Sequence, residues 1–94
     1  MSKDKLFSLV SDAITKQLDE VEKDSIKLES NLVSDFEADS VDIVSMMLGL
    51  ETIFKEQLTA TGTKVPMDKL GKVQTVKDLF DLMHDVIQEV ESKQ

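Results

Sequence analysis

The sequence has no cysteine and no arginine, and it contains one proline and three glycines in 94 residues. Without cysteine there can be no disulfide, no thiolate metal site and no cysteine nucleophile, which fits a reducing compartment. No apolar run approaches the roughly 18 residues that a transmembrane helix needs. The residues after Met1 are charged and no apolar signal core follows them. We therefore expect a cytoplasmic protein without membrane insertion.

The charge of the chain is strongly one-sided. Nineteen carboxylates face eleven lysines, so the net charge is −8 at pH 7. Such a surface repels nucleic acid and anionic lipid and attracts basic patches on proteins. The excess gathers between residues 35 and 56, where six carboxylates face only Lys55. Because the acidic run lacks the glycine and distal glutamate of an EF-hand loop, no metal site is expected.

Apolar residues recur every three or four positions in long segments, and no strand alternation is present, which predicts an all-α fold. The first helix is expected from about Lys3 to Lys23, the second from Asp39 or Ser40 to about Leu58, and the last after Thr75 as N-cap, with Asp78 at N3. The predicted fold is a single domain over residues 1–94.

The connections between these helices differ in length. Residues 23–38 form a long first loop, and Thr59–Lys64 reads as an exposed loop. Pro66 to Leu70 fits one helical turn, with Gly71 just past its end. The expected architecture is a small four-helix bundle with three longer helices and one short helix.

The apolar periodicity also predicts which side chains are buried. The expected stripes are Phe7, Val10, Ile14, Leu18 and Val21 in the first helix, Val44, Met47, Leu50 and Phe54 in the second, and Val76, Phe80, Met83, Ile87 and Val90 in the last. Ile26, Leu28, Leu32, Val33 and Phe36 are expected to anchor the first loop. Because a helix buries one face, Ile43 and Ile53 should point toward solvent or a partner.

The run Asp39-Ser40-Val41-Asp42 stands where an acidic loop turns into an apolar-periodic segment. Asp39 can act as the N-cap and Asp42 as its N3 partner, as in a capping box. Ser40 should then be exposed at a helix N-terminus. Unpaired backbone N–H groups and the positive end of the helix dipole favour a phosphate at that position. A capping serine without chemistry is the alternative interpretation.

These residues resemble the Asp-Ser-Leu motif of acyl carrier proteins, and the likeness covers nearly the whole chain. It includes Leu32, Phe36, Ala38, Asp39, Ser40, Asp42, Val44, Leu50 and Phe54, and then Val65, Pro66, Val73, Thr75 and Val76. The resemblance implies that Ser40 carries a 4′-phosphopantetheine arm derived from coenzyme A. The protein would hold acyl groups as thioesters on that arm and would have no catalytic residues of its own.

The resemblance also implies partners and further site residues. The expected partners are a phosphopantetheinyl transferase and the acyl-transferring and condensing enzymes of lipid or fatty acid biosynthesis, with the carrier itself monomeric. Partner recognition is assigned to Asp39, Val41, Asp42, Ile43 and Glu51, and an acyl pocket to Met47, Leu50, Val65, Leu70 and Leu79.

Several residues depart from the family pattern and suggest a specialised carrier with its own partner enzymes. Glu37 stands where glycine is usual, and Ile43 and Ile53 occupy positions that are often acidic or polar in relatives. Two alternatives stay open: a carrier of aminoacyl or polyketide units, and an unmodified acidic helical adaptor. The lone His84 has no second histidine or cysteine with which to form a metal site or a nucleophile–base pair.

Overall fold

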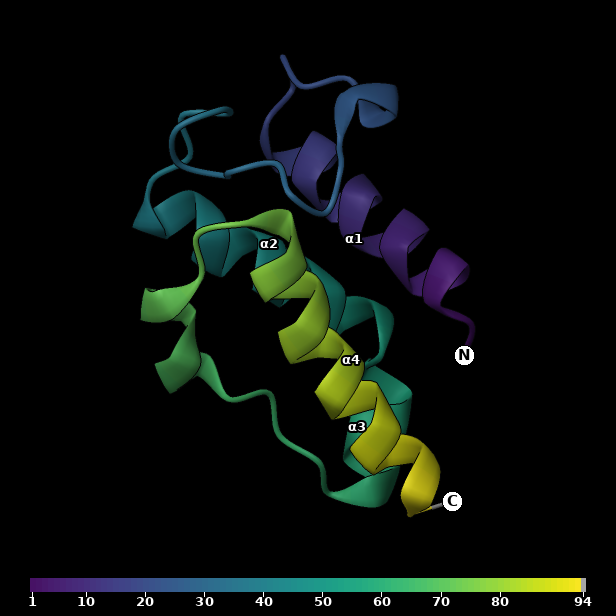
Figure 1. Ribbon diagram of the computed structural model, residues 1–94. Coiled ribbons are helices and arrows are strands. Elements are labelled where there is room, and N and C mark those ends of the chain that lie inside the picture. The colour runs from purple at the N-terminus through teal and green to yellow at the C-terminus, as the bar shows by residue number, and fades with distance from the viewer. Residues whose placement is uncertain (94) are drawn as a thin grey trace.

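The computed structural model describes residues 1–93, which fold into four α-helices and two 3₁₀ helices, with one isolated β-bridge between Asn31 and Thr75. The helices are α1 (Lys3–Gln17), η1 (Lys23–Ser25), α2 (Ser40–Ile53), α3 (Lys55–Thr61), η2 (Met67–Lys72) and α4 (Val76–Ser92). Figure 1 shows α4 in front of α2, with α1 to the right of them and the long first connection at the top. The expected all-α bundle is confirmed.

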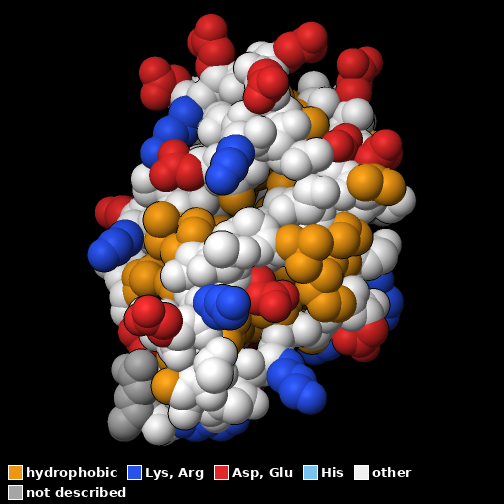
Figure 2. Space-filling view, turned by 180° about the vertical axis from the view of Figure 1, so that it is seen from behind, with side chains coloured by type: hydrophobic (Ala, Val, Ile, Leu, Met, Phe, Trp, Pro, Cys, Tyr) orange, Lys and Arg blue, Asp and Glu red, His pale blue; other side chains and the backbone are white. Residues whose placement is uncertain are grey.

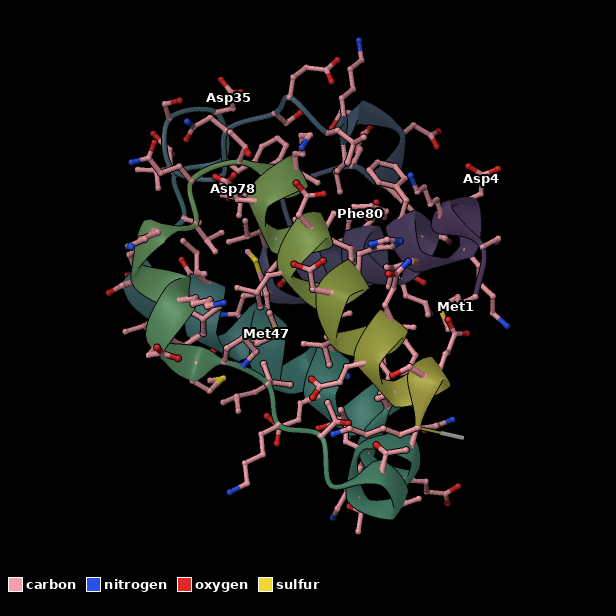
Figure 3. All side chains as sticks on the ribbon, turned by 60° about the horizontal axis from the view of Figure 1, so that its bottom comes forward. Met1, Asp4, Asp35, Met47, Asp78 and Phe80 are labelled. Carbon is pink, nitrogen blue, oxygen red and sulfur yellow. The ribbon has the colours of Figure 1, made fainter. Side chains whose placement is uncertain are left out.

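The core lies where α1, α2 and α4 meet. Fully buried side chains from each of these helices interlock there: Leu6, Val10 and Ile14, then Met46, Met47 and Leu50, and finally Val76, Leu79 and Met83. Phe80 of α4 faces α1 (Figure 3), and its ring centroid lies 6.5 Å from that of Phe7. All five residues expected in the stripe of the last helix are buried.

The first helix is shorter than the periodicity predicted. It ends at Gln17, because Leu18 adopts φ −117° and ψ 86°, outside the helical region. Asp19 and Glu20 follow, and negative charges at a helix C-terminus oppose the helix dipole. The stripe is also displaced: Leu6 is at its centre, while Phe7, Leu18 and Val21 pack only partly buried at its edge.

The second predicted helix is two helices. Phe54 separates α2 from α3 with φ −103° and ψ 16°, although its amide still donates to Leu50 O at 3.2 Å. The helix α3 then continues to Thr61, so the segment 59–64 is not simply an exposed loop. Gly62 closes α3 at φ 68°, a left-handed conformation that glycine adopts without strain. Thr63 is buried, and its hydroxyl pairs with that of Thr61 at 2.8 Å.

The short helix also differs in extent. Pro66 precedes η2 as its N-cap residue, and Gly71 lies inside η2, which continues to Lys72. In contrast, both capping boxes form as the sequence predicted. Asp42 N–H donates to Asp39 Oδ1 at 2.8 Å, and Asp78 N–H donates to Thr75 Oγ1 at 3.1 Å.

The long first connection is held against the N-terminus of α4 by backbone hydrogen bonds. Val76 N–H donates to Ser30 O at 2.9 Å, and Lys77 N–H donates to Leu28 O at 2.8 Å. In the opposite direction, Leu32 N–H donates to Gln74 O at 2.7 Å. Ile26 and Leu32 anchor the connection in the core, whereas Leu28 and Val33 are exposed, contrary to expectation.

We predict that Ser11→Ala stabilises the protein. Ser11 is 1% exposed, and its hydroxyl oxygen has no hydrogen-bond partner among the described residues. Removing an unsatisfied buried hydroxyl and improving helix propensity should raise the free energy of unfolding by about 1 kcal/mol. The melting temperature should rise by about 4–8 °C.

Ser8→Ala in the same helix is the matched control, because the Ser8 hydroxyl already accepts a hydrogen bond from Lys23 Nζ at 2.9 Å. Urea unfolding of both variants checks the prediction. A Ser11→Ala protein no more stable than the Ser8→Ala protein would contradict it.

Candidate functional site

Ser40 is the first residue of α2, and the connection before it and the helix after it fix its position. Ala38 is buried, and its N–H donates to Leu32 O at 2.9 Å, so the chain enters the helix from an anchored point. Asp39 caps the helix, and its own N–H donates to Asp42 Oδ2 at 3.1 Å. Ser40 is exposed, and its hydroxyl takes part in no hydrogen bond among the described residues. The exposure expected from the sequence is confirmed.

The N-terminus of α2 differs from that of α4 in one respect. In α4, the first two amides, of Val76 and Lys77, donate to carbonyl groups of the long connection. In α2, the corresponding amides of Ser40 and Val41 have no acceptor within residues 1–93. Two backbone donors and the positive end of a helix dipole therefore lie beside a free hydroxyl, an arrangement that favours an anion.

Asp42 is held by contacts within the protein. Its Oδ1 accepts a hydrogen bond from Gln17 Nε2 at 2.9 Å, and its Oδ2 accepts the Asp39 N–H. These donors, Gln17 first, lower the pKa of Asp42. The Gln17 contact ties the last residue of α1 to the first turn of α2. The sequence assigned Asp42 to partner recognition. Its carboxylate is already engaged within the protein, where it helps to position Ser40.

The outward face of α2 is shifted by one residue from the expected one. Ile43 is 5% exposed and belongs to the core, so the expectation that it faces solvent is wrong. Val44 is 38% exposed, although it was expected in the buried stripe. The exposure expected for Ile53 is confirmed, at 47%. The buried residues Ile43, Met47, Leu50 and Phe54 are spaced by four, three and four, but Val44 also fits a helical spacing, so periodicity alone does not select between the two positions.

The exposed part of α2 next to Ser40 is apolar. Val41 is 68% exposed and Leu48 is 48% exposed, while Glu51 is half-buried. Between Asp42 and Glu51 the helix carries no charged side chain. Figure 2 shows orange side chains across the middle of the face opposite to that of Figure 1, with red side chains crowded at the top. Leu48 was not singled out from the sequence.

The residues assigned to an acyl pocket divide into two groups. Met47, Leu50, Leu70 and Leu79 are buried in the core, at 0–5% exposure. Only Val65 lines an open pocket of about 630 Å³ between the end of α2, α3 and the segment that leads to η2. The structure therefore does not bring these five residues together around one open cavity. Their role in acyl binding stays a prediction.

A second group of carboxylates surrounds a smaller hollow. Glu20, Glu22, Asp35 and Glu37 line it together with Phe36. Within residues 1–93, no three histidine, cysteine or acidic side chains are placed so that they could hold a metal ion. His84 stacks on Phe80 with ring centroids 5.8 Å apart, which is a packing contact.

Glu37 is a strained residue beside the site. Its φ of 59° is left-handed, and it is the one residue other than glycine in residues 1–93 with a positive φ. A side chain with a Cβ atom costs about 1 kcal/mol or more in this conformation. This explains physically why glycine suits the position two residues before the helix cap.

Residues 1–93 contain no helix with both the length and the apolar character needed to cross a membrane. A search against protein-family models gives no match. Curated proteins named acyl carrier protein do match. The protein of Lactobacillus acidophilus is 37% identical over 83% of this chain and 88% of its own length. The protein of Syntrophobacter fumaroxidans is 35% identical over 79% of this chain and 82% of its own length. The protein of Coprothermobacter proteolyticus is 32% identical over 88% of this chain and 92% of its own length.

We predict that Glu37→Gly raises the free energy of unfolding by about 0.5–1 kcal/mol, because glycine adopts the left-handed conformation without strain. The larger conformational entropy of glycine in the unfolded chain offsets part of this gain. Glu37→Ala is the matched control. It removes the same carboxylate but keeps Cβ, so it should bring no comparable gain. Equal stabilities of the two variants in urea unfolding would show that strain is not the cause.

We also predict that Asp42→Asn changes how stability depends on pH. The folded-state pKa of Asp42 is lowered. Its hydrogen bonds therefore stabilise the folded protein above the unfolded-state pKa of about 3.9, and this contribution is lost as the pH falls through the lower folded-state pKa. Asp42→Asn should be less stable than wild type at pH 7, and the deficit should shrink as the pH falls from about 5 toward 2.

Asp85→Asn is the control, since Asp85 is exposed on α4 and accepts no hydrogen bond among the described residues. Unfolding curves at a series of pH values test the prediction. An Asp42→Asn deficit that stays constant down to the lowest pH would disprove the role of the ionised carboxylate.

Proposed function

This chain belongs to the acyl carrier protein family, and from this we propose that Ser40 carries its 4′-phosphopantetheine arm. The protein acts as a carrier and not as an enzyme. When bound, the arm supplies a thiol that holds an acyl group as a thioester. A chain without cysteine can take part in thioester chemistry in this way.

One observation supports Ser40 more than any other: its free hydroxyl lies at the open N-terminus of a long helix. Asp39 supplies the cap, so the hydroxyl is not needed for helix stability. The unpaired amides of Ser40 and Val41 can donate to the oxygens of a phosphodiester formed at that hydroxyl. The protein itself needs to supply little more than this position.

The modification requires a partner enzyme, because no base lies within hydrogen-bond distance of the Ser40 hydroxyl among the described residues. We propose a phosphopantetheinyl transferase in which Mg²⁺ and a base act on Ser40. The Ser40 oxygen forms a bond to the β-phosphorus of coenzyme A, and the pyrophosphate P–O bond breaks. Adenosine 3′,5′-bisphosphate leaves, and the hydroxyl proton passes to the base of the transferase.

The carrier acts by presenting its cargo to biosynthetic enzymes. We assign these to acyl transfer and condensation in lipid or fatty acid biosynthesis, with the carrier acting as a cytoplasmic monomer. The exposed Asp39 and Val41 flank Ser40 and are the residues of the recognition set that a partner reaches first. Ile43 contacts the core instead, so it contributes by supporting α2.

We predict that Ser40 is the sole attachment site. Wild type incubated with coenzyme A, Mg²⁺ and a broad-specificity transferase should gain the mass of one phosphopantetheine group. Ser40→Ala should gain none, and it should stay folded because Asp39 keeps the cap and alanine favours helix. Ser45→Ala, in the same helix, should be modified like wild type.

Intact-mass measurement reads all three proteins, and circular dichroism confirms that each is helical. A modified Ser40→Ala protein would move the attachment site elsewhere. A wild type that several transferases leave unmodified would favour the acidic adaptor.

A further inference from the structure

The open pocket beyond the end of α2 has a mixed lining, in which Leu58, Val65 and Met67 lie beside polar and charged side chains. It has a volume of about 630 Å³, which is within the range of pockets that bind small molecules. Lys55 of α3 and Lys64 of the following segment contribute ammonium groups, and Glu51 contributes a carboxylate. Thr52, Thr59 and Thr63 also line it, but the Thr52 hydroxyl already donates to Leu48 O at 2.9 Å and the Thr63 hydroxyl pairs with that of Thr61 at 2.8 Å. Such a lining suits a ligand that has an apolar chain and a charged end.

The charge of this pocket is opposite to that of the protein. Two lysines and one glutamate give the lining a charge of +1, whereas the whole chain has −8. The ion pairs among the described residues engage Lys23, Lys77, Lys93 and the N-terminus, and none of them uses Lys55 or Lys64. Many carboxylates gather instead at the top of Figure 2, away from this pocket. Two ammonium groups are therefore available to an anion.

The pocket also lies at a suitable distance from Ser40. Glu51 follows Ser40 by eleven residues, which corresponds to about 16 Å along a helix. An extended 4′-phosphopantetheine arm spans a comparable distance. Between the two ends, Val44 and Leu48 are exposed on the same side of α2 as Ser40 and Glu51. They offer an apolar path along which the arm can lie.

We propose that this pocket selects acyl groups whose far end bears a carboxylate, with Lys55 and Lys64 as the residues that determine this specificity. The proposal rests on the proposed attachment of the arm to Ser40. The thioester end of the cargo lies near Glu51 and Thr52, and the distal carboxylate meets the two ammonium groups. A neutral alkyl end leaves both lysines without a partner, and an ammonium end is repelled by them.

The test compares three cargoes of similar length. A broad-specificity transferase loads wild type from adipyl-, hexanoyl- and 6-aminohexanoyl-coenzyme A, and intact mass confirms each loaded form. Thermal unfolding is then followed by circular dichroism. The adipyl form should melt about 2–5 °C higher than the hexanoyl form, because its carboxylate pairs with the lysines. The difference should disappear at about 1 M salt, where screening extends over about 3 Å.

Paired variants locate the effect. Lys55→Gln with Lys64→Gln should abolish the adipyl advantage, whereas Lys69→Gln with Lys72→Gln, which changes the net charge equally outside this pocket, should keep it. Equal melting of adipyl and hexanoyl forms of wild type, or a higher melting temperature for the 6-aminohexanoyl form, would overturn the proposal. Failure of every loading reaction would instead overturn the assignment of Ser40, so the two outcomes are distinguishable.

Discussion

The structure depends on the backbone hydrogen bonds between the long first connection and the start of α4. Carbonyl groups of Leu28 and Ser30 accept the first two amides of α4, and Leu32 donates back to Gln74. This exchange satisfies donors that would otherwise be unpaired at a helix N-terminus. It also holds the connection close enough to the core for Leu32 and Ala38 to be buried, which sets where α2 begins. One helix N-terminus is closed by the connection, and the other is left open beside Ser40.

Some carboxylates near the open N-terminus of α2 accept hydrogen bonds that hold the fold together, and others do not. Asp39 and Asp42 form a reciprocal cap, and Gln17 adds a bond from the end of α1. The N-terminus of α4 has a similar arrangement, in which Asp78 accepts hydrogen bonds from the amides of Gln74 and Thr75. These bonds lower the pKa of Asp78. These carboxylates stabilise helix starts whether or not a partner is bound. In the connection, Asp35 accepts the Asn31 N–H at 2.8 Å, whereas the exposed carboxylates of Asp24, Glu29 and Glu37 accept no hydrogen bond among the described residues and can act at longer range on a basic partner.

Two features beside Ser40 have physical consequences. Glu37 keeps a Cβ atom and a charge in a left-handed conformation, so the turn before Ser40 is retained at a cost in stability. The outward face of α2 exposes Val41, Val44 and Leu48, and no charged side chain lies between Asp42 and Glu51. Apolar surface beside an attachment residue can serve both the arm and a partner, since each presents apolar groups.

Local signals in the sequence were sufficient for the starts of α2 and α4 and for the exposed position of Ser40. Both capping boxes involve residues three apart, so neighbours along the chain decide them, and the strong periodicity of α4 gave its buried face. Tertiary structure decided the rest. Periodicity did not distinguish Val44 from Ile43, because adjacent positions on an apolar helix differ by about 100° and packing against α1 and α4 selects between them. The end of α1 at Gln17 has a local cause, because the acidic Asp19 and Glu20 follow it. The burial of Phe54 at the break after α2 and the closed group of Met47, Leu50, Leu70 and Leu79 depend instead on packing between segments distant in the sequence, which no local pattern records.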